Sequence, residues 1–369
     1  MWVERLMKIS IVLGTRPEII KMSPIIRECE RLELDYFILH TGQHYSYNMD
    51  RVFFEDLELS DAKYNLDVGS GSPGEQTGKM LVGIEKVLEK ETPEVVLVQG
   101  DTNSTLAGAL VASKLGIKVG HVEAGLRSYD RRMPEEINRT LTDHCSYYLF
   151  APTEKAKRIL LGEGVPEKKI FVTGNTVVDA VFQNLEIANR KRNIINDLEL
   201  RSKDYFLVTA HRQENVDNKA RFAWILRGLK NIVEEFGLPL VYPIHPRSRK
   251  QIREFGLQVD EVRLIEPVDF LSFLQLENNA RLVLTDSGGV QEESCVLGVP
   301  CVTLRDNTER PETVEVGANV LAGADSDRIL ECSKIMVRRQ NRWENPFGDG
   351  RAGTKIVEEL RRTDLFGAE

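Results

Sequence analysis

The segment VVLVQGDTNSTLAGALVASKLGIKVGHVEAG (95–125) contains a complete strand–helix–strand pattern. An apolar run leads to Asp101, small residues follow, and a second apolar run leads to Glu123. The segment LVLTDSGGVQEESCVLGVPCVTLRD (282–306) repeats this design, with Asp286 in the corresponding place. Alternation of this kind is typical of βαβ units and parallel sheets. We therefore predict an α/β fold with two doubly wound domains of similar design.

The same alternation extends along the chain in both directions. We expect strands at 9–13, 35–40, 95–99, 118–123, 147–151, 170–173, 205–209, 240–244, 262–265, 282–285 and 300–304, and helices at 78–89, 104–115, 153–162 and 221–236. A chain of 369 residues is long for one core, so we predict domains 1–175 and 176–353. Ligands of such sheets bind outside the carboxyl ends of the strands, so two facing domains would hold a ligand between them.

Composition excludes several classes of protein. The formal net charge of -8 makes nucleic acid an unexpected partner. The five cysteines form no CxxC pair and no cluster with histidine, which argues against structural zinc and against a disulfide framework. No apolar run approaches the roughly 20 residues of a membrane span, and the N-terminus lacks a signal-peptide core. We expect a cytoplasmic protein with no membrane partner.

Two short motifs resemble cofactor sites but lack the required context. GSGSPG (69–74) matches G-x-G-x-x-G, yet no acid stands at a strand end about 20 residues later. GKM (78–80) lacks the upstream glycine and the Ser or Thr of a phosphate-binding loop. We therefore interpret 69–74 as a loop and predict no NAD, ATP or other cofactor.

TDSGGVQEE (285–293) predicts a nucleotide site. Gly288 and Gly289 stand where a strand hands over to a helix, so a ligand can approach the backbone closely. A helix start offers unpaired N–H groups and a positive dipole end, which suit a phosphate. An acid one turn later cannot face that phosphate, so it would face hydroxyl groups. A diphosphate with a ribose has both parts.

Further polar residues follow the predicted strands of the first domain. Arg16 and Lys21 stand near a helix start, as a phosphate clamp would, although Lys21 could equally be a solvated surface lysine. Asp101 faces a helix N-terminus, which should keep it ionised, and a simple N-cap role is the alternative. Glu123 ends a strand in HVEAGLR.

The helix opened by Pro134 carries Glu135 and Arg139 on one face, while Glu136 fits an ordinary helix-start acid paired with an arginine. In the second domain, His211 ends the first strand and His245 ends the next. Together, three carboxylates, imidazoles and cations could perform acid/base chemistry on an anionic, nucleotide-like substrate. No metal-ligand cluster accompanies them.

The motifs GTRPE, QGDT, HVEAGLR, PEEINR, GNTVVD, AHRQEN, TDSGGVQEE, RDNTERPE and NPFGDG occur in this order between Gly14 and Gly350. As an ordered set they resemble the non-hydrolysing UDP-N-acetylglucosamine 2-epimerases. The resemblance implies a glycosyltransferase-B fold, two Rossmann-like domains with a cleft between them. It also implies that a last helix, within 354–369, crosses back to the first domain.

The resemblance implies reversible conversion of UDP-N-acetylglucosamine (UDP-GlcNAc) to UDP-N-acetylmannosamine (UDP-ManNAc), by elimination of UDP and its re-addition to a 2-acetamidoglucal. It places Asp101, Glu123 and Glu135 as acid/base candidates and His211 beside the departing diphosphate. The implied binding residues are Arg16, Lys21, Arg139, His245, Phe273, Ser287, Gly288, Gly289, Glu293 and Arg310. Among them Ser287, Gly288 and Gly289 would hold phosphates, Glu293 the ribose hydroxyls, Arg310 the nucleotide end and Phe273 the uracil.

Relatives of this family can bind a second UDP-GlcNAc as an activator. Gln43, His44, Gln76 and Arg212 stand at matching places, together with His245. Glu75 precedes Gln76 where some relatives carry a basic or amide residue, which argues against activation. A homodimer is the family expectation, and surface glycans are the expected destination of the product.

Three other interpretations remain open. A hydrolysing epimerase would release UDP and free N-acetylmannosamine from the same fold. A glycosyltransferase would use an acceptor and fewer acids. A non-catalytic sensor of nucleotide sugars would not need Asp101 or Glu135.

Overall fold

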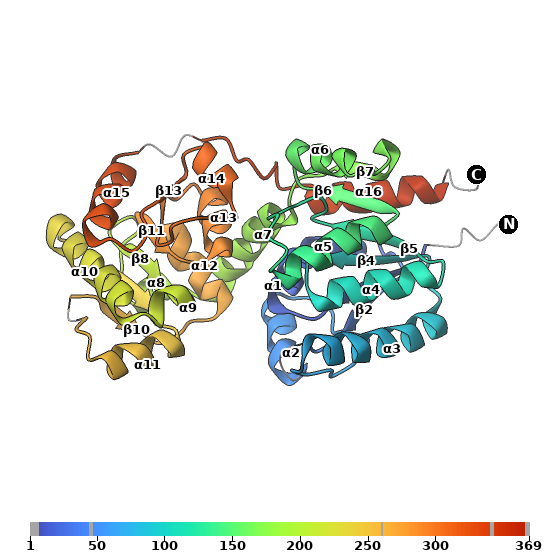
Figure 1. The fold of residues 1–369 in the computed structure, drawn as a ribbon, viewed down its shortest axis with the longest axis horizontal. Helices are drawn as coiled ribbons and strands as arrows, with labels where there is room; N and C mark the ends of the chain where they lie inside the picture. Colours follow the sequence, from blue (N-terminus) through green and yellow to red (C-terminus); the bar gives the residue numbers. More distant parts are fainter. Residues whose placement is uncertain (1–6, 44–46, 260, 340–342, 366–369) are drawn as a thin grey trace. The chain divides into compact units, whose positions relative to one another are not determined.

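The computed structural model describes residues 7–43, 47–259, 261–339 and 343–365. The chain forms two compact units, Met1–Ala180 with Phe347–Glu369, and Val181–Pro346. Each unit contains one parallel sheet flanked by helices (Figure 1). The two parallel α/β units expected from the alternating pattern are therefore present.

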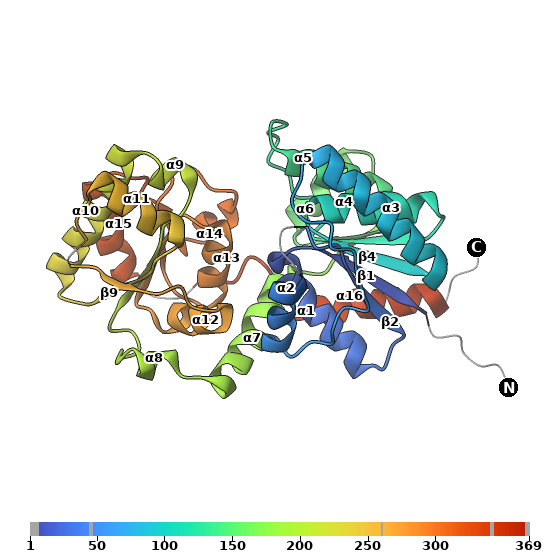
Figure 2. The same cartoon turned by 90° about the horizontal axis from the view of Figure 1, so that it is seen from below.

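The first unit is built on a seven-stranded sheet in the order β3-β2-β1-β4-β5-β6-β7. Its strands are β1 (Ile9–Leu13), β2 (Tyr36–His40), β3 (Tyr64–Asn65), β4 (Val95–Gln99), β5 (Lys118–Val122), β6 (Tyr148–Ala151) and β7 (Ile170–Val172). Its helices are α1 (Arg16–Arg31), α2 (Tyr47–Asp56), α3 (Pro73–Glu91), α4 (Asn103–Lys114), α5 (Pro134–Cys145), α6 (Glu154–Gly162), a 3₁₀ turn (Glu167–Lys169) and α16 (Ala352–Leu365). Helices α1 and α16 cover one face of the sheet, and α3, α4 and α5 cover the other (Figure 2).

The second unit has a six-stranded sheet in the order β10-β9-β8-β11-β12-β13. Its strands are β8 (Phe206–Thr209), β9 (Leu240–Pro243), β10 (Arg263–Ile265), β11 (Leu282–Thr285), β12 (Cys301–Thr303) and β13 (Asn319–Leu321). Its helices are α8 (Ile194–Asp197), α9 (Gln213–Val216), α10 (Lys219–Phe236), α11 (Pro246–Phe255), α12 (Phe270–Asn279), α13 (Gly288–Val296), α14 (Pro311–Glu315) and α15 (Ser326–Arg338). Helix α7 (Thr176–Lys191) includes the point at which the chain passes from the first unit to the second.

The second sheet is buried on both faces, and successive side chains along its strands point alternately into two apolar cores. Phe206 and Val208 of β8 pack into one apolar cluster, while Leu207 between them packs into another. Leu284 and Val283 of β11 divide in the same way. This period of two explains why these strands are continuous apolar runs.

Every expected strand occurs, within one residue at either end. The edge strands β3 and β13 were not expected. Strand β3 has only two residues, which are too few to show a periodic pattern. Helix α3 begins at Pro73, capped by Ser72, so the interpretation of 69–74 as a loop is wrong for its last two residues.

The family motifs GNTVVD and NPFGDG have a structural role in the first unit. The Asn175 N–H donates to the Phe347 carbonyl at 2.8 Å. The Asp179 carboxylate accepts the N–H groups of Ala352 and Gly353 at 3.2 and 2.9 Å, at the start of α16. These bonds fix the C-terminal helix, which packs on α1.

Candidate active site

Functional candidates in the first unit gather where the strand order reverses. The sheet order places β1 beside β4, and β5 follows β4. Arg16 lies just beyond β1, Asp101 beyond β4 and Glu123 beyond β5. Ligands of doubly wound sheets bind at this topological switch point, outside the carboxyl ends of the strands.

Glu123 is buried in a strained backbone conformation. Its φ of 73° lies in the left-handed region, which a glutamate rarely adopts. Lys21 Nζ donates to both carboxylate oxygens at 2.8 and 3.0 Å, and Gln99 Nε2 donates to Oε2 at 2.5 Å. These donors stabilise the ionised form of Glu123. The Lys21 side chain is only 14% exposed, so the solvated-lysine interpretation is wrong.

Asp101 has a different environment. It is ion-paired with Arg139 of α5, and a third of its side chain is exposed. Burial raises the pKa of Asp101, Arg139 opposes this shift, and the charge of Glu123 adds to it. The residue that caps α4 is Thr102, which accepts the Thr105 N–H at 3.2 Å. The N-cap interpretation of Asp101 is therefore wrong.

The two acids at the start of α5 differ in burial. The Glu135 side chain is exposed and makes no hydrogen bond or ion pair within the described part of the chain. Glu136 is buried and accepts the Ser128 N–H and hydroxyl and the Tyr129 N–H, each at 2.9 Å. Burial raises the pKa of Glu136, but the hydrogen bonds from Ser128 and Tyr129 lower it by more, so the net shift is downward. Glu136 thus holds the preceding loop, and Glu135 is available for a substrate.

Sequence reasoning missed Glu18, a buried residue that joins two of these turns. Its carboxylate accepts the Gly14 N–H at 3.0 Å and the hydroxyls of Thr15, Thr102 and Thr105 at 2.8, 2.7 and 3.1 Å. The turn that carries Arg16 is thereby fixed to the turn that carries Asp101. The GTRPE motif contained the signal, but its glutamate reads as an ordinary acid in a helix first turn.

His121 was also missed. Its Nδ1 lies 2.6 Å from Asp143, and its Nε2 lies 2.8 Å from the Gly100 carbonyl. Asp143 also accepts the Gly125 N–H at 3.2 Å. These buried contacts position the backbone next to Asp101 and next to Glu123.

The second unit has its own switch point, where β8 lies beside β11. Asp286 follows β11 and accepts the N–H groups of His211 and Arg212, at 3.0 and 2.9 Å. His211 Nδ1 lies 3.4 Å from the same carboxylate. The His211 and His245 rings are 5.5 Å apart, and burial followed by the His211 charge lowers the pKa of His245.

The glycines of α13 are not explained by packing. Ser287 is the N-cap and makes no side-chain capping bond. A Cβ on Gly288 would come no closer than 3.6 Å to another atom, and one on Gly289 no closer than 3.9 Å. Neither position needs a positive φ. Close approach of a ligand to an open helix N-terminus explains the pair better.

Three further candidates for nucleotide binding lie near this helix in the sequence or the fold. Arg310 is ion-paired with buried Glu292 at 2.6 Å. Glu293 is half-buried. Burial and then the charge of Glu293 raise the pKa of Glu277 on α12. Phe273 is partly buried and packs against an apolar core cluster.

The candidates for an activator site fall into three groups. Gln76 is buried, donating to the carbonyls of Gln43 and Gly69 at 2.7 and 2.8 Å. Gln43 Oε1 accepts the Ser104 hydroxyl at 2.8 Å. Arg212 belongs to the second unit, and His44 lies outside the described residues.

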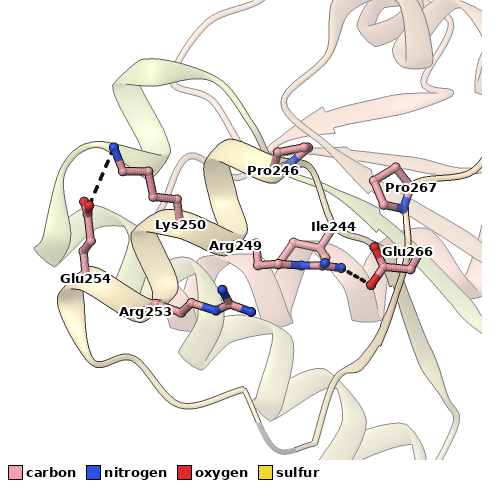
Figure 3. Close-up of a pocket in the computed structure, with 8 residues that line it drawn as sticks. All are labelled: Ile244, Pro246, Arg249, Lys250, Arg253, Glu254, Glu266 and Pro267. Atoms are coloured by element: carbon pink, nitrogen blue, oxygen red, sulfur yellow. Dashed lines mark ion pairs between the residues drawn. The ribbon is translucent and has the colours of Figure 1, made fainter.

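A pocket of about 390 Å³ in the second unit contains none of the predicted site residues (Figure 3). It is lined by Ile244, Pro246, Arg249, Lys250, Arg253, Glu254, Glu266 and Pro267. Arg249 is paired with Glu266 at 2.8 Å, and Lys250 with Glu254 at 3.6 Å. Because two of its three cations are paired, this pocket has little charge to offer an anion.

Other features were sought over the described ranges. There, no three His, Cys, Asp or Glu side chains are grouped as a metal ion would need. No helix in those ranges has the length and apolar character to cross a membrane. The cysteines are all free thiols.

Comparison with known proteins gives consistent matches over nearly the whole chain. The family model of the UDP-N-acetylglucosamine 2-epimerases matches residues 27–361. The UDP-N-acetylglucosamine 2-epimerase of Methanocaldococcus jannaschii is 59% identical over 96% of this chain and 99% of its own. The crystal structure of the M. jannaschii enzyme in complex with UDP-GlcNAc and UDP covers 96% of this chain and 100% of its own, with a TM-score of 0.85. The predicted glycosyltransferase-B fold class is confirmed.

A relative with a different substrate is also similar. The UDP-2,3-diacetamido-2,3-dideoxy-D-glucuronate 2-epimerase of Pseudomonas aeruginosa is 45% identical over 96% of this chain and 100% of its own. Both relatives bear the name of a 2-epimerase of a UDP-linked amino sugar, so the shared element is the reaction at C2.

Proposed function

Because the chain belongs to the UDP-N-acetylglucosamine 2-epimerase family, we propose that it interconverts UDP-GlcNAc and UDP-ManNAc reversibly and without hydrolysis. The chain is an epimerase of nucleotide sugars. We propose UDP-GlcNAc rather than the UDP-linked diacetamido-glucuronate as the substrate, because the relative named for UDP-GlcNAc is 59% identical and the relative named for the glucuronate is 45% identical.

The chemistry requires acids and bases rather than simple proton removal. The C2 proton of the sugar is not next to a carbonyl, so its direct abstraction is prohibitively slow. Elimination avoids this difficulty: a base takes the C2 proton, the C2–H electrons form a C1=C2 bond, and the C1–O bond to UDP breaks. UDP then adds back to C1 while an acid delivers a proton to the other face of C2.

The observation that carries the proposal is the unequal pair of carboxyl groups at neighbouring strand ends. Lys21 and Gln99 donate to Glu123, which favours its ionised form and suits a base. Burial favours the protonated form of Asp101, which suits an acid. Their roles exchange in the reverse direction. Glu135, exposed on α5, is the third acid/base group.

The remaining roles concern the diphosphate. The N–H groups at Gly288 and Gly289 hold the phosphates beside Ser287, whose own N–H donates to Thr285 at 2.9 Å. His211 assists departure of UDP. Arg16, Lys21 and Arg139 add positive charge near the diphosphate. Lys21 and Arg139 also favour the ionised forms of Glu123 and Asp101, with which they pair. His245 and Arg310 contact the nucleotide, Glu293 its ribose and Phe273 its uracil.

Activation and assembly are further parts of the proposal. A second UDP-GlcNAc binds with the help of Gln43, His44, Gln76 and Arg212, and the enzyme acts as a cytoplasmic homodimer. Pure UDP-ManNAc should then react slowly until UDP-GlcNAc is added. Linear progress from the first seconds would contradict this activation.

The test is proton NMR of the purified enzyme with UDP-GlcNAc in D₂O, with EDTA and without NAD. The proposal predicts UDP-ManNAc with deuterium at C2. Free UDP with N-acetylmannosamine would favour the hydrolysing epimerase. An unchanged spectrum would favour a transferase or a sensor, and turnover of the diacetamido-glucuronate alone would move the substrate to that class.

A further inference from the structure

Arg310 stands at a position where a small capping residue is usual. It is the N-cap of α14, with a φ of -124° and a ψ of 58°, and its side chain makes no capping bond. Serine, threonine, aspartate and asparagine cap helices well, so arginine is a poor local choice here. Other residues therefore have to fix the Arg310 backbone.

Two threonine hydroxyls hold the Arg310 backbone. The Arg310 N–H donates to Thr308 Oγ1 at 2.9 Å, and the Thr313 hydroxyl donates to the Arg310 carbonyl at 2.7 Å. Thr308 is half-buried and Thr313 is buried. Both the N–H and the carbonyl of Arg310 are thus engaged by side chains of its own turn.

Both threonines lead to one buried amide oxygen on α13. The Thr308 hydroxyl donates to Gln291 Oε1 at 2.5 Å. Asn319 Nδ2 donates to the same oxygen and to Thr313 Oγ1, each at 3.2 Å. Gln291 is fully buried, and its Nε2 finds no acceptor among the described residues. The Gln291 side chain therefore acts through its oxygen, which connects α13 to both sides of Arg310.

The next residue on α13 contacts the Arg310 side chain. The Glu292 side chain is buried, and its Oε1 lies 2.6 Å from Arg310 Nε. A buried carboxylate is costly without a partner of opposite charge, so this ion pair restrains the guanidinium as it neutralises the acid. Helices α13 and α14 lie side by side (Figure 1). Helix α13 thus holds the Arg310 backbone through Gln291 and the Arg310 side chain through Glu292.

The same helix begins with the proposed phosphate contacts. Gly288 and Gly289 are its first residues, and Gln291 and Glu292 follow directly. An α-helix rises 1.5 Å per residue, so these four residues lie within about 6 Å along one rigid element. Arg310 can move relative to the phosphate-binding N–H groups only if its contacts with α13 break.

We propose that Gln291 and Glu292 are positioning residues, which hold the Arg310 guanidinium at a fixed place relative to the phosphate-binding start of α13. This inference rests on the proposed binding of a UDP-sugar. An arginine that is ordered before the ligand arrives loses less conformational entropy on binding. The second turn of α13 therefore contributes to nucleotide affinity without touching the nucleotide.

The test measures UDP affinity by calorimetry in the full-length wild type, Thr308→Val, Thr308→Ser and Gln291→Met, each with and without Arg310→Ala. Thr308→Val should weaken UDP binding about threefold to tenfold, as expected for loss of a neutral hydrogen bond. Gln291→Met removes the oxygen shared by both branches and should weaken binding at least as much. Thr308→Ser keeps the hydroxyl and should bind UDP as the wild type does.

The Arg310→Ala background separates positioning from a general effect on the fold. In that background Thr308→Val and Gln291→Met should no longer change UDP affinity, because the guanidinium that they position is absent. Equal losses in both backgrounds, or no loss in Thr308→Val, would overturn the proposal. If Gln291→Met does not fold, Thr308→Val at its half-buried position still decides the question.

Glu292→Asp tests the side-chain contact in the same way. It keeps the charge but shortens the side chain, so UDP binding should weaken in the wild-type background and not with Arg310→Ala. The matched control is Glu235→Asp, which shortens the acid of the Lys334–Glu235 pair at 2.8 Å between α10 and α15. We expect unchanged UDP affinity in the control, and an equal loss in the control and in Glu292→Asp would overturn the role of Glu292.

These measurements require UDP binding but no turnover. A wild type that binds UDP without epimerising UDP-GlcNAc would contradict the proposed reaction alone. A wild type that epimerises UDP-GlcNAc, with variants that bind UDP as tightly as it does, would contradict the positioning role alone.

Discussion

At the scale of residues, surroundings separate two carboxyl groups of the same switch point. Glu123 accepts hydrogen bonds from the Lys21 ammonium and the Gln99 amide. Burial and the charge of Glu123 raise the pKa of Asp101. Lys21 thus helps to determine which of the two acids begins as a base. A pair whose environments push the protonation states apart is typical of acid/base catalysis.

Replacing Asp101 by Asn should lower kcat about a hundredfold or more, because an amide cannot transfer the proton. UDP affinity should remain close to that of the wild type. Steady-state kinetics and calorimetry measure the two effects.

The matched control for this change is Asp197→Asn, which breaks an exposed Arg–Asp pair with Arg192 at 2.9 Å. We expect unchanged turnover in the control. Unchanged turnover in Asp101→Asn would remove Asp101 from the mechanism.

The positions of the candidate site residues in the fold were predictable, because strand ends are visible in the sequence. The side chains that contact these residues were not predictable. Lys21 and Glu123 are 102 residues apart, and nothing local in either segment indicates the other. Glu18 was missed for the same reason, since Thr102 and Thr105 belong to another turn.

At the scale of elements, the residue that caps α4 also helps to position the candidate active site. Thr102 caps the helix in a reciprocal capping box with Thr105, and its hydroxyl also donates to Glu18 at 2.7 Å. Asp101 is the residue immediately before this cap. The same hydroxyl therefore contributes to helix stability and to the placement of the acid.

Thr102→Ala should destabilise the fold by about 1 kcal/mol, as expected for loss of an N-cap. It should also lower kcat, because Glu18 loses one of the bonds that hold the Asp101 turn. Thr153→Ala removes the N-cap of α6, where Thr153 accepts the Ala156 N–H at 3.2 Å. The control should lose similar stability in denaturant unfolding but keep its kcat; equal kcat in both variants would contradict the coupling.

At the scale of the whole molecule, the chain uses one design twice. Both sheets reverse their strand order once. Arg16 and Asp101 follow the two strands at this reversal in the first unit, and His211 and Ser287 follow those in the second. The first unit supplies the proposed acid/base groups and the second the proposed phosphate and ribose contacts. The repeated pattern predicted both sheets, but it did not predict their edge strands β3 and β13.

The free energy of unfolding should depend on pH through the titration of Glu277. Between the ordinary pKa of a glutamate and the raised pKa of Glu277, the folded protein keeps a proton that the unfolded chain releases. The free energy of unfolding therefore falls as pH rises through this window, by at most about 1.4 kcal/mol per pH unit from this group. Glu277→Gln removes the titration, so its Tm relative to wild type should increase from about pH 5 upward. A difference in Tm that stays constant at all pH values would contradict a raised pKa of Glu277.

The most direct measurement of the central claim is the fate of ¹⁸O placed in the oxygen that bridges C1 of the sugar and the β-phosphate of UDP-GlcNAc. If UDP leaves C1 and is recaptured, the label should move into the non-bridging positions of the β-phosphate during epimerisation, without accumulation of free UDP. Formation of UDP-ManNAc with all of the label still in the bridge would contradict an elimination in which the β-phosphate of UDP leaves C1 and rotates before its re-addition.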